Sequence, residues 1–388
     1  MRFCSSIFTQ VLKAIDRDEF RDIVSRYKGD AYGKSFDSWA HMVALVYAQL
    51  SAVKSLRGLE AGFNAQSQHH YHFGCGKLQR STLADANKRR PFEIFAEVFA
   101  LLGLRLDRKT RRDGDQLVRL IDSTPIPLGK LYDWAAWNGR IRGMKVHVVY
   151  DPGADYPRIL DVTDANVNDA QVGRAIQLEP NTTYVVDKGY CHYGWWTAID
   201  AVGSIFVTRP KTNMVLELIR KREVTEKEGD GFTILEDCDV KFASKGDSKL
   251  PISLRRVKVR RHENGDEITL ITNDLVRSAC QIAALYKGRW QIELLFRWIK
   301  QHLKIKKFLG RNPNAIRLQI YAAMIAFALL RIAKNTYRIE LPILRLTDLV
   351  IQCLFERRNL GTIDRPPPVN LSRKRLWLNE NQLELNYV

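Results

Sequence analysis

The pattern of apolar runs between residues 115 and 213 limits the fold of this chain more than any other feature. LVRLIDST ends near Asp122, and KVHVVYD and PRILDVTD follow, joined by the turn-forming PGADY. We then expect a helix with Asn168 or Asp169 near its cap, TTYVVDKGY ending near Asp187, a helix through WWTAIDAV, and SIFVTRPKTN. Three strands in an antiparallel meander, then helix, strand, helix and strand, predict an α/β fold with a mixed sheet.

A second β-rich segment, residues 214–272, interrupts this order. It contains SLRRVKVRRHENGDEITLIT, where Asn264 and Gly265 predict a type I′ hairpin turn. In the first strand of that hairpin, alternation places Arg256, Lys258 and Arg260 on one face. One interpretation is a basic edge strand that resists aggregation. Because the chain carries a net charge of +18, we favour a face that follows phosphates.

The stretch YKGRWQIELLFRWIKQHLKIKKF, starting at Tyr286, has apolar residues at helical spacing and no proline, which predicts a largely buried helix. Glu293 is a single acid in this helix, and the polar residues within about 40° of it form a narrow stripe. The stripe consists of Tyr286, Arg289, Arg297, Lys300 and Lys304. Ion pairs of Glu293 with Arg289 and Arg297 on a solvated face are one interpretation. A buried helix, however, carries such a stripe when an anion, a metal ion or both lie opposite.

Two strand-end aspartates can complete a metal site with Glu293. Asp122 and Asp187 end the first and fourth strands, and their carboxylates emerge side by side if those strands are neighbours in the sheet. Three converging carboxylates repel one another unless they are neutralised, which a hard divalent cation such as Mg²⁺ does through oxygen ligands. The alternative is that Asp122 and Asp187 are turn-capping residues. That interpretation is the favoured one for Asp151, Asp161, Asp164 and Asp169.

Composition indicates a globular protein with a polyanionic partner. Hydrophobic residues make up 45% of the 388 residues, and 61 Lys and Arg face 43 Asp and Glu. The six cysteines form no CxxC pair, which argues for a reducing, cytosolic setting and against a zinc ribbon. HHYHFGC lacks a second spaced pair and is interpreted as an ordinary polar loop. The start of the chain does not resemble a signal peptide, and IYAAMIAFALL predicts a core helix rather than a membrane span.

The first part of the chain predicts a helical DNA-binding domain. Residues 1–114 show helical periodicity, and RSTLADANKRRP ends a short helix with Lys88, Arg89 and Arg90. Two helices joined by a turn, the second of them basic, suggest DNA contact, although such a basic run is also typical of a solvated helix end. The expected domains are 1–114, the two parts of the core at 115–213 and 273–340, the insertion at 214–272, and a C-terminal tail at 341–388.

These residues together resemble one protein family, the DDE transposases of bacterial insertion sequences, which have a ribonuclease H-like catalytic core. The resemblance is closest to the insertion-sequence-four group, marked by the spacing Y-x(2)-R-x(3)-E-x(6)-K. Tyr286, Arg289, Glu293 and Lys300 fit that spacing, and IDST and VVDKGY match the contexts of the first two family aspartates. The β-rich insertion before the glutamate is also typical of the group. The resemblance covers roughly residues 115 to 335.

The resemblance implies roles for these residues. Asp122, Asp187 and Glu293 would coordinate two Mg²⁺ or Mn²⁺ ions, while Tyr286, Arg289 and Lys300 would hold phosphates of the transposon end. The implied function is cut-and-paste transposition, with inverted-repeat end DNA and target DNA as partners, in the bacterial cytoplasm near the nucleoid. Two element ends need two active sites, so we expect a homodimer on DNA. The alternatives are a DNA-binding protein that has lost catalysis and a ribonuclease H-like nuclease without transposition.

Overall fold

The computed structural model describes residues 5–31, 36–51, 53–110, 117–242, 252–302 and 308–365. The side chains of residues 107–110, 159, 160 and 302 are also left undescribed. The chain divides into two compact units, residues 15–329 and residues 1–14 with 330–388. The larger unit contains the expected insertion and the expected core up to residue 329. This division differs from the expected domains, because the first residues of the chain belong with its last ones.

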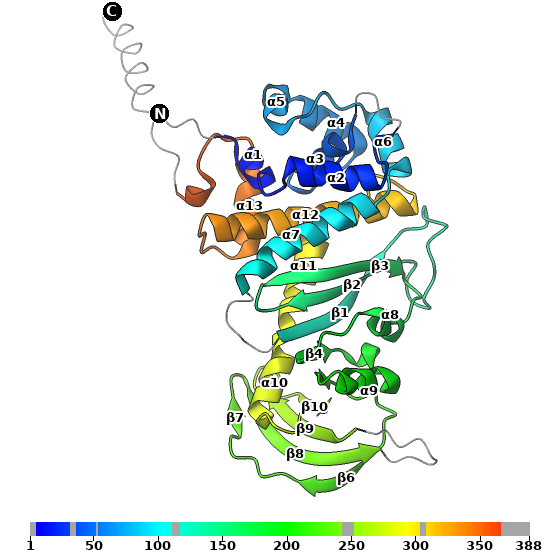
Figure 1. Ribbon diagram of the computed structural model, residues 1–388, viewed down its shortest axis with the longest axis vertical. Coiled ribbons are helices and arrows are strands. Elements are labelled where there is room, and N and C mark those ends of the chain that lie inside the picture. Colours follow the sequence, from blue (N-terminus) through cyan, green and yellow to red (C-terminus); the bar gives the residue numbers. More distant parts are fainter. Residues whose placement is uncertain are drawn as a thin grey trace, which may run out of the picture. The chain divides into compact units, whose positions relative to one another are not determined.

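Helices fill the first part of the larger unit (Figure 1). They are α2 (Arg17–Arg26), α3 (Ser38–Gln49), α4 (Leu56–Asn64), α5 (His70–Phe73), α6 (Arg80–Arg89) and α7 (Glu93–Thr110). α7 packs on β3 (Tyr156–Asp164). The rings of Phe99 and Tyr156 stack there with centroids 5.4 Å apart, and the Tyr156 hydroxyl donates to Phe99 O at 3.1 Å.

The sheet has the mixed topology expected of a ribonuclease H-like core. β1 (Leu117–Pro127), β2 (Gly143–Asp151) and β3 form the antiparallel meander. After α8 (Asp169–Ala175), β4 (Thr182–Val186) pairs with β1 in parallel, and after α9 (Tyr193–Ala201), β5 (Ile205–Thr208) pairs with β4 in parallel. The order of these strands is therefore β3-β2-β1-β4-β5, which confirms the predicted antiparallel meander and mixed sheet.

The insertion extends the same sheet. Its strands are β6 (Leu216–Lys221), β7 (Glu228–Gly229), β8 (Phe232–Phe242), β9 (Leu254–Arg261) and β10 (Glu267–Thr272). β10 pairs with β5, and the order continues as β10-β9-β8-β6. The β9–β10 hairpin is present, but its turn is not type I′, which needs positive φ at both central residues. Gly265 has a φ of 72°, whereas Asn264 has no positive φ and bonds its Nδ2 to Asp266 Oδ2 at 2.6 Å.

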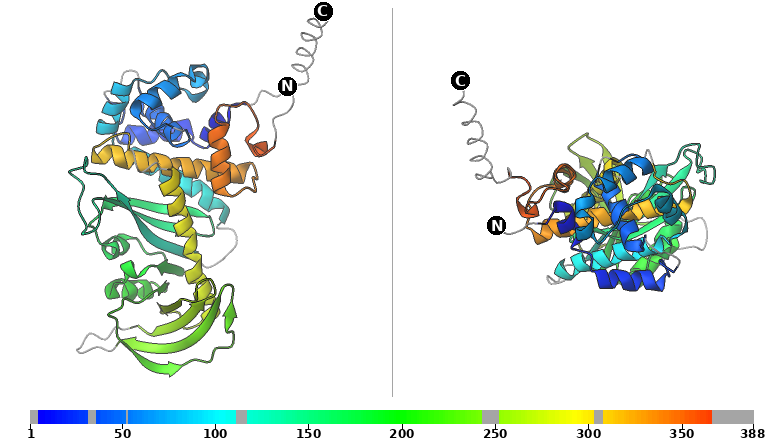
Figure 2. Two further views of the ribbon diagram at one scale, coloured as in Figure 1. Left: turned by 180° about the vertical axis from the view of Figure 1, so that it is seen from behind. Right: turned by 90° about the horizontal axis from the view of Figure 1, so that it is seen from above.

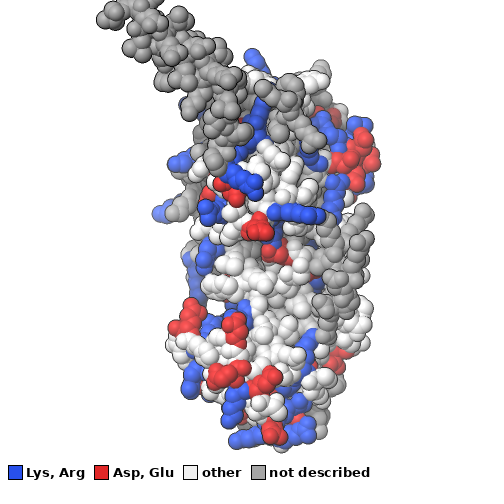
Figure 3. Space-filling view, turned by 90° about the vertical axis from the view of Figure 1, so that its left-hand side faces the viewer, with Lys and Arg blue, Asp and Glu red and all other residues white. Residues whose placement is uncertain are grey.

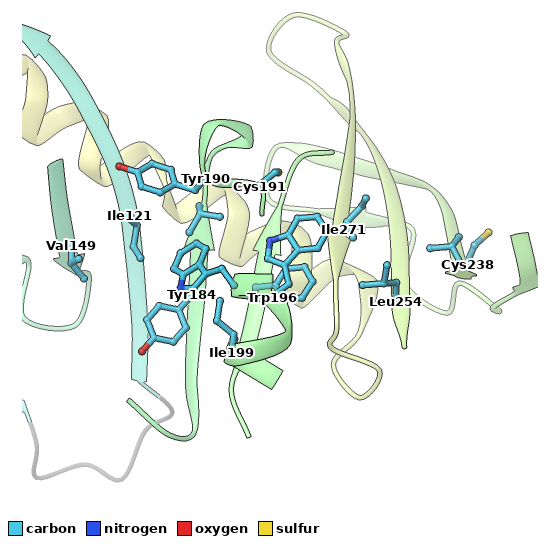
Figure 4. Packing of buried hydrophobic residues seen from close by; sticks show 14 residues of the cluster. Ile121, Val149, Tyr184, Tyr190, Cys191, Trp196, Ile199, Cys238, Leu254 and Ile271 are labelled. Atoms are coloured by element: carbon cyan, nitrogen blue, oxygen red, sulfur yellow. The ribbon is translucent and has the colours of Figure 1, made fainter. Parts of the chain in front are cut away.

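An aromatic core packs against β1, which carries Asp122, and β4, which Asp187 follows. α9 contributes Trp195, Trp196 and Ile199, which are buried against Ile121 of β1 and Tyr184 of β4. Figure 4 shows Trp196 and Ile199 lying beside these strands. The ring of Trp196 stacks on that of Phe206 with centroids 4.7 Å apart. Burial of such large rings fixes α9 against β4 and β5.

The stretch that contains Glu293 forms two successive helices rather than one. α10 (Ala279–Gly288) ends with Arg289 as its C-cap, and α11 (Trp290–His302) begins directly afterwards. Figure 2 shows both in yellow along nearly one direction. Ile292, Leu295 and Ile299 are buried as expected, while Trp290 and Leu294 are exposed. The helix is therefore amphipathic, not buried on all sides.

One helix among the described residues, α12 (Pro313–Thr336), is long and apolar enough to cross a membrane. Within the protein, however, 89% of the apolar segment of this helix is buried, as expected for the core helix that the sequence predicts.

The smaller unit contains α1 (Ile7–Leu12), α13 (Ile343–Gln352) and the turn Leu360–Thr362. Phe8 N donates to Leu354 O at 2.9 Å, and the Gln10 side chain bonds to Arg358 O at 2.7 Å. These bonds tie the first helix to the segment after α13.

Candidate active site

The parallel pairing of β1 and β4 places two aspartates next to each other. Ile121 is in register with Val186, so Asp122 and Asp187 occupy the following positions on neighbouring strands. Asp187 directly follows β4 and precedes the short 3-10 turn Lys188–Tyr190. Asp122, which was expected at the end of its strand, lies within β1, because that strand continues to Pro127. Both backbones are fixed by the sheet up to this point. The two carboxylates are therefore held by rigid elements rather than by a loop.

Arg289 joins Asp122 to Glu293. From the junction of α10 and α11, its Nη1 donates to Asp122 Oδ2 at 2.6 Å and its Nη2 to Glu293 Oε1 at 2.5 Å. The Arg289 and Asp122 side chains are only 13% and 16% exposed. The ion pair of Glu293 with Arg289, four residues earlier, is thus present, but it faces the sheet and a second acid rather than solvent.

Arg209 is the second cation of this group. It follows β5, and its Nη2 donates to Asp187 Oδ1 at 2.8 Å. Arg209 is not among the site residues that the sequence predicts. Its position in the sequence could have indicated it, since Arg209 stands in VTRPKTN directly after the strand that neighbours β4. Residues at the carboxyl ends of adjacent parallel strands meet at one edge of the sheet.

The carboxylates have different electrostatic environments. Burial raises the pKa of Asp122 to about 6, although Arg289 and the Ser123 amide oppose this shift, and the charges of Asp187 and Glu293 add to it. Burial also acts on Asp187, but the hydrogen bond and charge of Arg209 outweigh it and hold the pKa of that carboxyl below its usual value. Asp122 therefore senses both other carboxylates, as expected for a single cluster.

The donor set of this cluster fits a hard divalent cation. The Arg289 guanidinium bonds the carboxylates of Asp122 and Glu293, and Asp187 follows the strand next to Asp122. Mg²⁺ and Mn²⁺ take such oxygen ligands. In the part of the chain that the structure describes, no three His, Cys, Asp or Glu side chains are close enough to hold an ion as they stand. Arg289 would have to yield some of its contacts before a cation could bind Asp122 and Glu293 together.

A pocket of about 630 Å³ opens beside Glu293. It lies between the insertion strands β8–β10 and the helices α10 and α11, with Tyr286, Arg289 and Trp290 among its lining residues. The Arg289 guanidinium carbon lies 5.6 Å from the centroid of the Tyr286 ring. The Nε atoms of Arg209 and Arg289 are buried and have no hydrogen-bond partner among the described residues. Such donors favour an anionic ligand.

Two further basic residues of the predicted stripe have exposed side chains. Arg297 and Lys300 are exposed on α11, and the Arg297 guanidinium carbon lies 5.6 Å from the centroid of the Trp290 ring. Lys304 lies outside the described residues. Arg297 and Lys300 are therefore accessible to a large partner, as a DNA-binding stripe requires.

The basic residues of the insertion are already paired with acids. Arg256 bonds to Glu236 at 2.8 Å, and Lys258 and Arg260 both contact Glu267, at 2.6 and 2.8 Å. Figure 3 shows Lys and Arg interleaved with Asp and Glu on one face of the molecule. β9 lies between β10 and β8, so the alternative interpretation as an edge strand is wrong. Phosphate contact by this face stays a prediction.

The basic residues at the end of α6 do not share one environment. Lys88 and Arg89 are exposed. Arg90 is 8% exposed, donates its Nη2 to Phe36 O and pairs with Asp30 at 3.4 Å. The Arg90 guanidinium is bound within the helical domain, so we do not propose Arg90 as a DNA contact.

The segment HHYHFGC is not the loop that the sequence suggests. It folds into short helices, in which His70 Nε2 bonds to Phe63 O at 2.9 Å.

A ribonuclease H-like sheet with aspartates at matching positions of two adjacent parallel strands, and a glutamate on a later helix, defines the class of nucleic-acid phosphoryl-transfer enzymes. The family profile described as the transposase DDE domain matches residues 113–329. The chain belongs to this family of DDE transposases and is a DNA transposase of the insertion-sequence-four type. Residues 3–76 match a domain of unknown function, DUF4372.

Similar proteins carry the same designation. The protein y4zB of Sinorhizobium fredii, named as a transposase, is 65% identical over 306 residues, which are 79% of this chain and 86% of the relative. A Geobacillus stearothermophilus protein named as the transposase of insertion sequence element IS5377 is 30% identical over 262 residues, covering 67% and 68% of the two chains. A piggyBac transposase synaptic complex with hairpin DNA covers 98% of this chain and 86% of its own at 11% identity, with a TM-score of 0.46, which supports no further argument.

Proposed function

We propose that Asp122, Asp187 and Glu293 are the catalytic residues of this transposase and hold one or two Mg²⁺ or Mn²⁺ ions. The observation that carries the proposal is the position of Arg289, which bonds Asp122 and Glu293 beside the neighbouring Asp187. When bound, divalent ions activate an attacking water or hydroxyl and stabilise the leaving oxygen of a phosphodiester. The sheet and α11 orient the three carboxylates for this chemistry.

The basic residues around the carboxylates would bind the DNA backbone. Arg289 and Arg209 can each turn a buried Nε–H toward a phosphate oxygen, and guanidinium–phosphate bonds are strong because both partners are charged. The polar stripe that the sequence places around Glu293 would extend this contact over further phosphates. In addition to Arg289, it comprises Tyr286, Arg297, Lys300 and Lys304.

The reaction that follows is cut-and-paste transposition. Hydrolysis at each element end would free a 3′-hydroxyl, which then attacks a phosphodiester of the target DNA. The substrates are the inverted-repeat end DNA and the target DNA, and the site of action is the bacterial nucleoid in the cytoplasm. Each end needs one active site, so two protomers would assemble on paired ends, where DNA neutralises their positive charge.

The alternative is a DNA-binding protein that derives from a transposase and no longer cleaves. The chain retains all three acids in a mutually sensitive cluster, which favours activity. Cleavage of a duplex carrying the inverted repeat that flanks the gene separates the two functions. D122N, D187N and E293Q should each abolish Mg²⁺-dependent cleavage while binding that duplex nearly as well as the wild type. Cleavage by all three variants would show that the site is elsewhere.

A further inference from the structure

A fourth carboxylate contacts the segment that carries Asp122. Asp169 is the first residue of α8, and its Oδ1 accepts a hydrogen bond from Ser123 Oγ at 3.0 Å. Ser123 directly follows Asp122, and its amide donates to Asp122 Oδ1 at 2.8 Å. Successive side chains of a strand point to opposite faces, so Asp169 lies on the other side of β1 from the Asp122 carboxylate. The sequence favours a turn or cap role for Asp169, but Asn168 is the N-cap of α8.

The same carboxylate packs against the turn that follows Asp187. A Cβ atom added to Gly189 would lie 2.9 Å from Asp169 Oδ2, which is closer than real Cβ contacts. Gly189 is in the 3-10 turn Lys188–Tyr190, which begins directly after Asp187. One carboxylate therefore touches the residue after Asp122 and the glycine two positions after Asp187.

Lys145 and a buried polar cluster hold Asp169 in place. Lys145 Nζ on β2 donates to Asp169 Oδ1 and to Val167 O, both at 2.9 Å, and the lysine side chain is only 14% exposed. Beneath this pair, His147 Nδ1 lies 3.3 Å from the Tyr190 hydroxyl and its Nε2 lies 2.9 Å from Thr163 Oγ1. In Figure 4 the Tyr190 hydroxyl points toward β1.

We infer that Asp169 is a positioning residue that sets the spacing of Asp122 and Asp187, and through it the affinity of their site for a divalent cation. This inference rests on the proposed metal-binding role of those two aspartates. A cation binds two carboxylates well only when they lie within a narrow range of distances from each other. Asp169 contacts both segments that set this distance, at Ser123 and at Gly189. Groups that orient metal ligands from outside typically change metal affinity about 10- to 100-fold when they are removed.

The test measures Mn²⁺ binding to the full chain without DNA, with electron paramagnetic resonance as the readout of free and bound Mn²⁺. D169A should raise the dissociation constant about tenfold, and S123A, which removes one hydroxyl and keeps the carboxylate, by a smaller factor in the same direction. D200N is the matched control. Asp200 lies on α9 and accepts a bond from Asn273 Nδ2 at 2.7 Å, without contact to either segment, so this variant should bind Mn²⁺ like the wild type.

A purely structural role would lower thermal stability without changing metal affinity. Binding is therefore measured well below the melting temperature of each variant, and cleavage by D169A should recover toward the wild-type rate at saturating Mn²⁺. Wild-type Mn²⁺ affinity in D169A and S123A, with binding lost in D122N, would overturn the positioning role and leave the proposed catalytic site standing. Wild-type affinity in D122N itself would instead refute that site.

Discussion

Arg289 Nη1 lies 2.6 Å from Asp122 Oδ2, although the two residues are 167 positions apart in the chain. This bond connects the junction of α10 and α11 to the first strand of the sheet. The helices therefore dock on β1 through charged groups of the active site as well as through apolar contacts. The stability of the metal-free protein and the electrostatics of the site depend on the same residues.

Replacing Asp122 by Asn should stabilise the metal-free protein above pH 6. Burial raises the pKa of Asp122 from 3.8 to about 6, so the carboxyl stabilises the fold when protonated. That contribution is complete below the unfolded-state pKa and is lost as the pH rises through the folded-state pKa. Asn resembles the protonated acid, so the gain is on the order of 2 kcal/mol at pH 7.5 and declines toward pH 4. Urea unfolding in EDTA measures it, and a D122N protein less stable than the wild type at pH 7.5 would contradict the expectation.

The stability of the insertion should depend on the buried ion pair between Arg255 and Asp237. Arg255 Nη2 and Asp237 Oδ2 lie 2.6 Å apart with side chains 3% and 4% exposed, and Arg255 also donates to Asp274 O and Arg277 O. R255M should therefore destabilise the protein by about 3–5 kcal/mol, because it leaves a buried carboxylate unpaired.

The R255M/D237L double variant is the control for this pair. Replacing both partners by apolar residues removes the unpaired charge, so much of the lost stability should return. Denaturant unfolding compares the two variants. A double variant as unstable as R255M would mean that the backbone bonds of Arg255, not the ion pair, carry the effect.

Lys88 and Arg89 should contribute to DNA binding through phosphate contacts. Both are exposed at the end of α6. If each contacts one phosphate, the K88E/R89E variant should lower the log–log salt dependence of affinity by about 0.9 per contact. Fluorescence anisotropy with a labelled duplex at several salt concentrations measures the slope. K77E, at another exposed lysine of this domain, is the control, and equal slopes in both variants would remove these residues from the interface.

The basic face of β9 should also contribute to the salt dependence of DNA binding if it contacts phosphates of the DNA backbone. Each of its three bases contacts Glu236 or Glu267, so DNA would have to compete with these acids. Joint charge reversal at Arg256, Lys258 and Arg260 should flatten the salt dependence. An unchanged slope would mean that the pairs serve only to stabilise the β8–β9–β10 sheet.

The sequence predicted the fold well where local patterns and pairing rules agree. Alternating apolar runs determined the meander and the parallel strands, and adjacency of β1 and β4 brings Asp122 and Asp187 together. The break at Arg289 was not predicted, because Gly288 is tolerated inside helical patterns and carries no stop signal by itself.

Other features depend on tertiary contacts that no local pattern records. Arg90 continues a basic run in the sequence, yet it is buried by packing against Phe36 and Asp30, which precede it by more than 50 residues. Asp169 follows a helix cap and so resembles a turn residue, while its contacts come from β1, β2 and the turn after β4. Such residues are found by proximity in space, not by spacing along the chain.

The central claim is that Asp122, Asp187 and Glu293 share one metal site, and Fe²⁺-directed cleavage of the polypeptide tests it most directly. Fe²⁺ in place of Mg²⁺, with ascorbate and peroxide, produces hydroxyl radicals that cut the backbone close to the bound ion. We predict cuts near all three residues in the wild-type chain, suppressed by excess Mg²⁺ and lost in D122N. Cuts confined to other segments, or an unchanged pattern in D122N, would contradict it.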